Sequence, residues 1–261
     1  MPPRIAIPMP HSTNREYSER AIVQYERAVE QAGGAPVRVP LDQTPAEVMK
    51  VIERCDAVLL PGSNADVDPS KFGAPRSLHA AAADPRRDTV DELLLQDAYN
   101  MHKPILGICY GLQSLNVYRT GTLIQHIPDS LPLEVRTKVN HEAGKGVPVA
   151  HNVEIEQNSR LAAIVVGPTS RRRPIVVPVN SSHHQSADVI GDGLRVIARC
   201  PDDGIIEALE GTAPEHFVLA VQWHPERSLD DDEPSRALFR ALIEAAQQRH
   251  KELTDEFESV K

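Results

Sequence analysis

Residues 107–111, with the sequence Gly-Ile-Cys-Tyr-Gly, place one cysteine between two glycines. The stretch follows the apolar run "KPILGI" and precedes a segment that predicts a helix over Leu112–Tyr118. A sharp strand-to-helix turn crowds the backbone on both sides of its central residue, so only small residues fit there. Such a turn presents Cys109 at the carboxyl end of a strand, where the following helix N-terminus favours a thiolate. The pattern fits a nucleophile with a lowered thiol pKa, and it fits a small buried cysteine at a tight turn equally well.

A base for such a thiol is offered by the stretch "AVQWHPE", in which His224 and Glu226 flank Pro225. Proline stiffens this turn, so the carboxylate can hold one ring nitrogen while the other faces a sulfur. A thiol nucleophile needs a base, and the base needs an orienting group. We therefore expect a catalytic triad of Cys109, His224 and Glu226.

The elements that position these residues follow from the hydrophobic pattern. Strands are predicted at Arg4–Ile7, 35–40, Asp56–Gly62 and 103–108. Helices are predicted at Glu16–Ala32, Pro45–Arg54, Asp88–Met101 with Asp88 as cap, and Leu112–Tyr118. This alternation indicates a parallel sheet with helices on both faces.

The middle of the chain has a different character. Between Thr122 and Leu209 the sequence holds short β-like segments and turn residues, and a long helix begins near Ser235. We expect one α/β domain over residues 1–250 with an antiparallel β elaboration. A charged tail that frays is expected at residues 251–261.

Composition and charge argue against several classes of protein. The 261-residue chain carries a formal net charge of −9, which argues against nucleic acid as a main partner. No apolar run approaches the length of a membrane span, and the N-terminal stretch lacks a signal-peptide pattern. Three cysteines cannot all pair, so a cytoplasmic, reducing setting is expected, with Cys55 and Cys200 structural. The basic run Arg171–Arg173 is expected to be a solvated loop.

Neither a metal nor a cofactor is expected. The histidines lack zincin spacing, no Cys-x-x-Cys pair occurs, and no glycine-rich phosphate loop is present. Adjacent residues on a strand point to opposite faces, so His183 and His184 do not form a ligand pair. Four further histidines are expected to be structural: His11, His126, His141 and His151.

Together, "PILGICYGLQSLNV" and "AVQWHPE" resemble the class I glutamine amidotransferases. The resemblance is closest to the free-standing γ-glutamyl-γ-aminobutyrate hydrolase-like branch, peptidase C26. Four further stretches are similar to that branch: "LLPGSNADVDPSKFG", "RRDTVDE", "VNSSHHQ" and "DDGIIEALE". The resemblance covers residues 4–245 and implies a flavodoxin-like three-layer sandwich with a mostly parallel central sheet.

The resemblance implies a role for each triad residue. Cys109 would attack a γ-glutamyl amide carbonyl to give a thioester that water hydrolyses. His224 would act as base and then as acid to the leaving amine, and Glu226 would orient it. The backbone N–H groups of Gly62 and Tyr110 would form the oxyanion hole.

A substrate pocket is implied as well, formed by Ser63, Asp66, Gln113, His183, His184 and Gln185. Asp66 and Asp68 would bind the substrate's α-amino group or tie their loop, and Asp203 and Glu207 would support the fold or contact ligand. This sequence has Ser63 where the branch has glycine, and Tyr110 where it often has arginine.

Four functions remain in view. The first is a stand-alone hydrolase of a small γ-glutamyl amine such as γ-glutamyl-GABA. The second is a glutaminase subunit that delivers ammonia to a separate synthase. The third is a binding protein without activity, against which the complete triad argues. The fourth is an unrelated cysteine-elbow enzyme of the glyoxalase or deglycase kind, which leaves the His-Pro-Glu stretch unexplained. Nothing in the sequence fixes the oligomeric state, so a homodimer is kept open.

Overall fold

A computed structural model of the chain describes residues 1–167 and 174–259, with side chains described as far as residue 252. The basic run Arg171–Arg173 lies outside the described residues. No helix within the described residues is both long and apolar enough to cross a membrane.

The core of the fold is a sheet of nine strands in the order β2-β1-β3-β4-β11-β10-β9-β6-β7. The first five strands in this order are parallel: β2 (Ala35–Val39), β1 (Arg4–Pro8), β3 (Ala57–Leu60), β4 (Ile105–Ile108) and β11 (Val218–Val221). The other four are antiparallel to their neighbours: β10 (Ile206–Gly211), β9 (Leu194–Arg199), β6 (His151–Ile155) and β7 (Ile175–Val179). A separate antiparallel pair is formed by β5 (Leu123–Ile124) and β8 (Ser186–Ala187).

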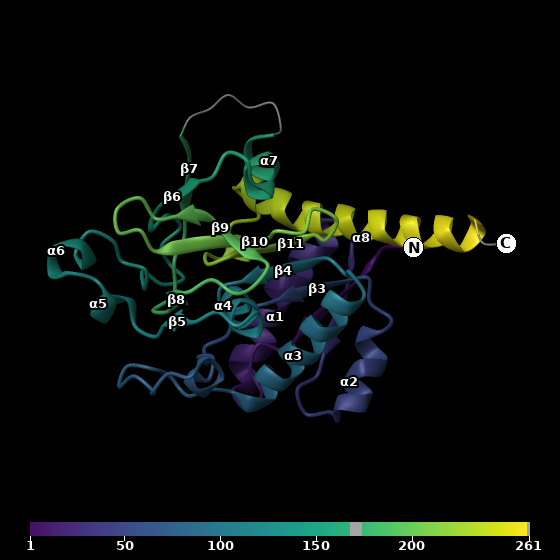
Figure 1. The fold of residues 1–261 in the computed structure, drawn as a ribbon, viewed down its shortest axis with the longest axis horizontal. Coiled ribbons are helices and arrows are strands. Elements are labelled where there is room, and N and C mark those ends of the chain that lie inside the picture. Colours follow the sequence, from purple (N-terminus) through teal and green to yellow (C-terminus); the bar gives the residue numbers. More distant parts are fainter. Residues whose placement is uncertain (168–173, 260–261) are drawn as a thin grey trace.

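Helices cover both faces of the sheet (Figure 1). One face is covered by α1 (Arg15–Gln31), α7 (Arg160–Val166) and α8 (Glu233–Ser259). The other is covered by α2 (Pro45–Ile52), α3 (Pro85–Asn100) and α4 (Tyr110–Tyr118). Four short elements complete the structure: α5 (Ile127–Ser130), α6 (Leu133–Arg136) and the 3-10 turns η1 (Pro69–Phe72) and η2 (Pro225–Arg227). The predicted α/β sandwich with a parallel core and antiparallel additions is confirmed.

One predicted helix boundary is wrong. The helix expected from Asp88 begins at Pro85, and its N-cap is Asp84, whose carboxylate accepts the backbone N–H groups of Arg86 and Arg87. Proline suits the first helical position because it has no N–H to satisfy. Asp88 is therefore one turn inside the helix, where its carboxylate accepts the Tyr110 hydroxyl.

Sheet register brings the catalytic candidates to one edge. In the parallel pairing, Leu60 of β3 lies beside Gly107 of β4, and Ile108 of β4 lies beside Val221 of β11. The residues that follow these three strands therefore leave the sheet together at its carboxyl edge. This edge carries Gly62, Cys109 and His224.

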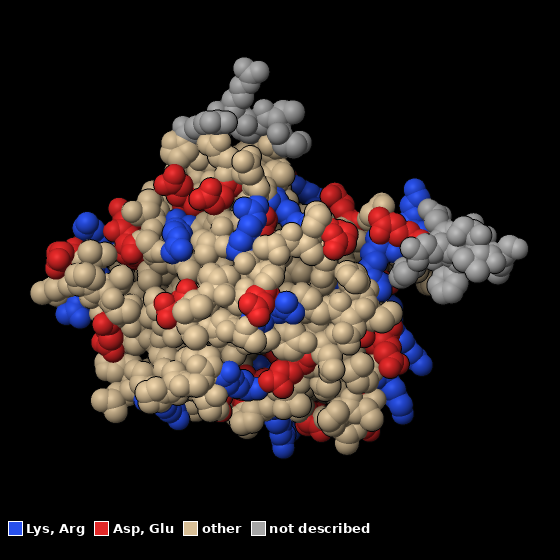
Figure 2. All heavy atoms as spheres, in the orientation of Figure 1, with Lys and Arg blue, Asp and Glu red and all other residues tan. Residues whose placement is uncertain are grey.

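The surface carries charges of both signs. Figure 2 shows lysine and arginine side chains interspersed with aspartate and glutamate over the face that it displays. This mixture agrees with the moderate negative net charge of the sequence.

Candidate active site

Cys109 occupies a strained turn between β4 and α4. Its φ of 53° and ψ of −105° lie outside the regions that L-residues usually adopt. The backbone N–H of Cys109 donates to the Val221 carbonyl at 2.8 Å, which holds the turn against β11. Such strain at the residue before a helix is the geometry of a nucleophile elbow.

The flanking glycines are required by contact. A Cβ on Gly111 would collide with the Leu60 carbonyl oxygen and lie 2.7 Å from the Leu60 Cβ. A Cβ on Gly107 would lie 2.9 Å from the Gly111 carbonyl carbon. The sequence-based explanation of these glycines is thus confirmed: the helix start packs directly on the neighbouring strand.

His224 is held in one orientation. Its Nδ1 lies 2.8 Å from the Glu226 Oε1, across the turn that Pro225 begins. The Asn180 side chain accepts the His224 backbone N–H at 3.0 Å and donates to the His224 carbonyl at 2.8 Å. The Nε2 atom of His224 is buried and has no hydrogen-bond partner among the described residues. Since the carboxylate fixes the proton on Nδ1, Nε2 is left as a proton acceptor.

Gly62 lies against both the imidazole and the cysteine. A Cβ on Gly62 would lie 3.0 Å from the His224 Cε1 and 3.7 Å from the Cys109 Cβ. The cysteine and histidine side chains therefore both pack against this glycine. The sequence placed the three residues in separate motifs, and the fold brings them together.

The pKa of the Cys109 thiol differs from the value expected from the sequence. Burial raises the pKa of the Cys109 thiol to about 12, although Arg227 acts in the opposite direction. The predicted lowering of this pKa by the helix N-terminus is therefore wrong for the resting site, because desolvation of the thiolate outweighs it. Burial lowers the pKa of His224 below its ordinary value, and Glu226 opposes that change. A neutral thiol beside a neutral imidazole follows.

Glu226 stays ionised in this buried place. Burial alone would raise its pKa, but His224 and Arg227 together bring it below the ordinary value. An ionised carboxylate can stabilise the imidazolium that forms when His224 takes a proton.

The two predicted oxyanion donors differ in their surroundings. The Tyr110 N–H lies at the start of α4 and acts on the Cys109 sulfur, whose pKa it lowers. The Gly62 N–H donates to the Tyr25 hydroxyl at 3.0 Å. An oxyanion bound at Gly62 would have to take the place of that hydroxyl oxygen.

The Tyr110 side chain points away from the sulfur. It is buried, its hydroxyl donates to Asp88, and its ring lies 4.7 Å from the Arg87 guanidinium carbon. In this branch the position often carries arginine, and here the tyrosine packs in the interior. Its contribution to the site comes from the backbone.

The loop after β3 is tied to the loop that contains His184. Asp66 lies 2.9 Å from the His184 Nε2 and accepts the Ala81 N–H at 2.6 Å. This hydrogen bond raises the pKa of His184. Ser63 accepts the Ala65 N–H at 3.0 Å and so closes the turn beside Gly62. Asp66 was expected either to bind the substrate's α-amino group or to tie its loop. These contacts tie the loop.

The remaining pocket candidates lie in the interior. Gln113 donates to the Gln185 carbonyl and to the Gln222 side chain, each at 3.3 Å. The Gln185 side chain donates to the Gln125 carbonyl at 3.2 Å. His183 points away from His184, with its Nε2 facing Glu207. The structure thus brings Gln113 and Gln185 together and separates the two adjacent histidines.

Two cations beside the triad were missed by the sequence reasoning. The Arg227 Nε lies 3.5 Å from the Glu226 Oε1, and its Nη1 donates to Ser182 at 2.9 Å. Lys145 lies 5.2 Å above the Tyr17 ring, and its charge acts on His224. Arg227 could have been found because it follows the His-Pro-Glu stretch directly. Lys145 sits in a loop without a motif.

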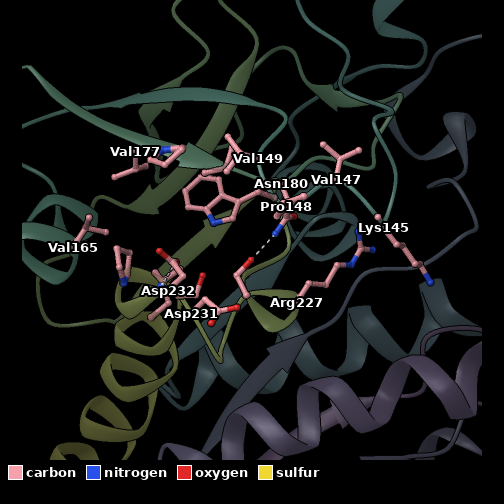
Figure 3. A pocket seen from close by; sticks show the side chains of 18 residues that line it. Lys145, Val147, Pro148, Val149, Val165, Val177, Asn180, Arg227, Asp231 and Asp232 are labelled. Carbon is pink, nitrogen blue, oxygen red and sulfur yellow. Dashed lines mark hydrogen bonds between the residues drawn. The ribbon is translucent and has the colours of Figure 1, made fainter.

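A cavity of about 530 Å³ opens next to these cations. Lys145 and Arg227 lie beside each other at one end, and Asp231 and Asp232 lie apart from them (Figure 3). Apolar side chains form much of the remaining wall: Val147, Val149, Val165, Val177, Trp223 and Leu238. Cys109, His224 and Glu226 do not line this cavity, which adjoins them through Arg227 and its contact with Glu226.

Fold and site together define an α/β protein with a cysteine elbow and a histidine–glutamate pair at the carboxyl edge of its sheet. The family model described as peptidase C26 matches residues 5–226. The chain belongs to the peptidase C26 family and is a glutamine amidotransferase-like hydrolase.

Individual relatives agree with this assignment. The chain is 32% identical over 231 residues to the gamma-glutamyl-gamma-aminobutyrate hydrolase PuuD of Escherichia coli (strain K12), covering 86% of this chain and 85% of the relative. It is 39% identical over 225 residues to Rv2859c of Mycobacterium tuberculosis (strain ATCC 25618 / H37Rv), whose name assigns it only provisionally to the glutamine amidotransferases. That match covers 85% of this chain and 66% of the relative.

Solved structures share the fold. The glutaminase domain of the Trypanosoma brucei CTPS superposes with a TM-score of 0.58 at 17% identity, covering 94% of both chains. PurLQS from Thermotoga maritima gives a TM-score of 0.57 at 18% identity, covering 94% of this chain and 99% of that one. These similarities establish the architecture.

Proposed function

We propose that the protein hydrolyses the γ-glutamyl amide bond of a small molecule through a Cys109 thioester. The observation that carries this proposal is the His224 ring, fixed by Glu226 and packed with Cys109 against Gly62 while its Nε2 stays without a partner. A buried acceptor nitrogen beside a strained cysteine is what a base for a thiol requires.

The chemistry follows from the neutral resting pair. His224 Nε2 takes the thiol proton as the sulfur attacks the amide carbonyl, and Glu226 stabilises the imidazolium. The imidazolium then gives this proton to the amine nitrogen as the C–N bond breaks, which leaves a γ-glutamyl thioester on Cys109. His224 next takes a proton from water, whose oxygen attacks the thioester carbonyl. The C–S bond breaks, and the proton returns to the sulfur as glutamate leaves.

The acid limb of the pH profile of kcat/KM tests whether His224 is the base. Because burial lowers the pKa of His224 below its ordinary value of 6.5, we expect kcat/KM to fall only below about pH 6.5. Glu226→Gln removes a charge that raises this pKa, so the acid limb should move to still lower pH while kcat drops. An acid limb at or above about pH 7 in the wild type would contradict the assignment.

The nature of the amine is suggested by the two cations. Arg227 contacts Glu226, the charge of Lys145 acts on His224, and both side chains line the same cavity. The cationic end of this cavity favours a leaving amine that carries a carboxylate, such as GABA. The similarity to the gamma-glutamyl-gamma-aminobutyrate hydrolase of Escherichia coli supports the same substrate class.

Lys145→Met tests this carboxylate contact. We expect the KM for γ-glutamyl-GABA to rise about tenfold, since one charge-assisted contact is worth about 1.4 kcal/mol. The KM for γ-glutamyl-butylamine, which lacks the carboxylate, should not change. Lys138→Met is the matched control, since Lys138 is exposed and does not line the cavity. An equal rise for both substrates would remove Lys145 from this role.

A substrate panel separates the two leading functions. Wild-type protein and Cys109→Ala are incubated with γ-glutamyl-GABA, γ-glutamyl-butylamine and glutamine, and released glutamate is measured. Cys109-dependent release from a γ-glutamyl amine, with little from glutamine, is the expected result. Release from glutamine alone would instead indicate the glutaminase subunit of an amidotransferase.

A further inference from the structure

Three histidines and a glutamate meet in the interior behind the His-His-Gln loop. Their ligand atoms, those of His141, His151, His183 and Glu207, all lie within 4.8 Å of one another. The Glu207 Oε1 lies 3.3 Å from the His141 Nδ1, 3.5 Å from the His151 Nε2 and 3.7 Å from the His183 Nε2. Each of the four side chains is at most 4% exposed.

Each histidine has an inner ring nitrogen that faces Glu207 and an outer ring nitrogen on the other side. The outer nitrogens all face hydrogen-bond acceptors. The His141 Nε2 lies 2.8 Å from the Asp203 carboxylate. The His183 Nδ1 lies 2.9 Å from the Gln185 carbonyl, and the His151 Nδ1 lies 3.1 Å from the Asn152 carbonyl. A carbonyl or carboxylate accepts a hydrogen bond, so each outer nitrogen carries the N–H. Each inner nitrogen is then left with a lone pair.

The centre of the cluster therefore holds acceptors without donors. The three inner nitrogens and both Glu207 oxygens lack hydrogen-bond partners among the described residues, although all five atoms are buried. Lone pairs that face a carboxylate in a buried site repel one another. A cation at the centre satisfies all of them at once.

A proton is the simplest such cation, and it is insufficient. The His141 Nδ1 lies closest to the Glu207 Oε1, at 3.3 Å. A proton on the His141 Nδ1 gives Glu207 one donor. The inner lone pairs of His151 and His183 still face the carboxylate.

We propose that His141, His151, His183 and Glu207 form a binding site for a divalent transition metal of the Zn²⁺ class. Three imidazole nitrogens and one carboxylate oxygen make a tetrahedral set that suits this ion. Asp203 and the two carbonyls supply the outer hydrogen bonds that orient histidine ligands in such sites. Four protein ligands leave no open position, so the site is structural.

The ion would connect segments that are distant in sequence. Glu207 lies on β10, His151 begins β6, and His141 and His183 belong to two loops. These two loops already meet, because the His183 N–H donates to the His141 carbonyl at 2.9 Å. The loop of His183 continues to His184 and Gln185, which contact Asp66 and Gln125 near the catalytic edge. The metal would thus fix the antiparallel part of the molecule against the active-site loops.

The test begins with metal-free wild-type protein, prepared with a chelator and titrated with Zn²⁺ and Co²⁺. We expect one tightly bound ion per chain, visible Co²⁺ bands of tetrahedral type, and a higher Tm with Zn²⁺ than without it. X-ray absorption should give four N/O ligands at about 2.0–2.1 Å. Because this measurement needs no variant, absence of stoichiometric binding to the wild type would overturn the proposal.

Variants locate the ion. Glu207→Gln should abolish tight binding, and Asp203→Asn should weaken it by about 10–100-fold, as loss of an outer hydrogen bond does. A more exposed group, His79, His126 and Asp129, could also attract metal, so His79→Ala is the matched control and should keep one ion. Loss of the ion in His79→Ala, with Asp203→Asn unchanged, would place it at the exposed group and overturn the proposal. The readouts do not depend on catalysis, so they stand whether or not the proposed hydrolysis is correct.

Discussion

Cys109→Ala and His224→Ala are each expected to lower kcat for γ-glutamyl amide hydrolysis by about 10⁴-fold or more. The first variant removes the atom that is proposed to form the thioester, and the second removes the His224 Nε2, which is buried without a partner among the described residues and is proposed to take the thiol proton. Because the resting thiol has a pKa of about 12, it is neutral at pH 7 and depends on that base. The measurement is the steady-state release of glutamate.

The double variant and a control substitution at a different cysteine complete this test. Cys109→Ala combined with His224→Ala should lose little more than either single variant, because the two residues act as a unit. Cys55→Ala is the matched control, since Cys55 is buried and its thiol contacts the Val51 carbonyl. Additive losses in the double variant would argue against a shared role. A His224→Ala enzyme that kept most of its activity would argue against the base.

Gly111→Ala is expected to destabilise the protein by about 3 kcal/mol, at the upper end of the usual cost of overpacking. Its Cβ would collide with the Leu60 carbonyl oxygen, which is a backbone atom at the end of the central strand β3 and not the end of a flexible side chain. Relief requires α4 to shift from β3, and this shift would also displace Cys109. Denaturant unfolding measures the loss, and the activity per folded molecule should fall with it.

Gly146→Ala is the matched control for this substitution. No heavy atom lies within 4 Å of a Cβ built at Gly146, and its backbone φ is not positive. We expect its free energy of unfolding to stay within about 1 kcal/mol of the wild type. Equal stability of Gly111→Ala and wild type would show that the helix start does not pack on β3 as described.

The sequence predicted the layered fold well because its signals were local. Apolar runs such as 103–108 mark buried strands, and the alternation with helices implies parallel pairing. Helix starts were less certain. Asp88 was expected to cap α3, but the cap is Asp84, because Pro85 suits the first helical position.

The meeting of Cys109, His224 and Glu226 at one sheet edge could be predicted, because each lies in a short stretch that follows a strand and the parallel strands end at the same edge. The thiol pKa could not be predicted, since it depends on burial by the surrounding layers, and burial reversed the expected direction. Lys145, whose charge acts on His224, comes from a loop without a motif. The histidine cluster was missed for the same reason: His141, His151, His183 and Glu207 come from four separate segments and show no ligand spacing.

The most direct test of the proposed chemistry is to look for the covalent intermediate. Wild-type protein is mixed with γ-glutamyl-GABA, quenched in acid during turnover, and analysed by intact-mass and peptide mass spectrometry. We predict that a fraction of the chains gains the mass of one γ-glutamyl group, located on Cys109 and removed by hydroxylamine. Turnover of the substrate by a Cys109→Ala variant at the wild-type rate, with no adduct on the wild-type cysteine, would contradict the account.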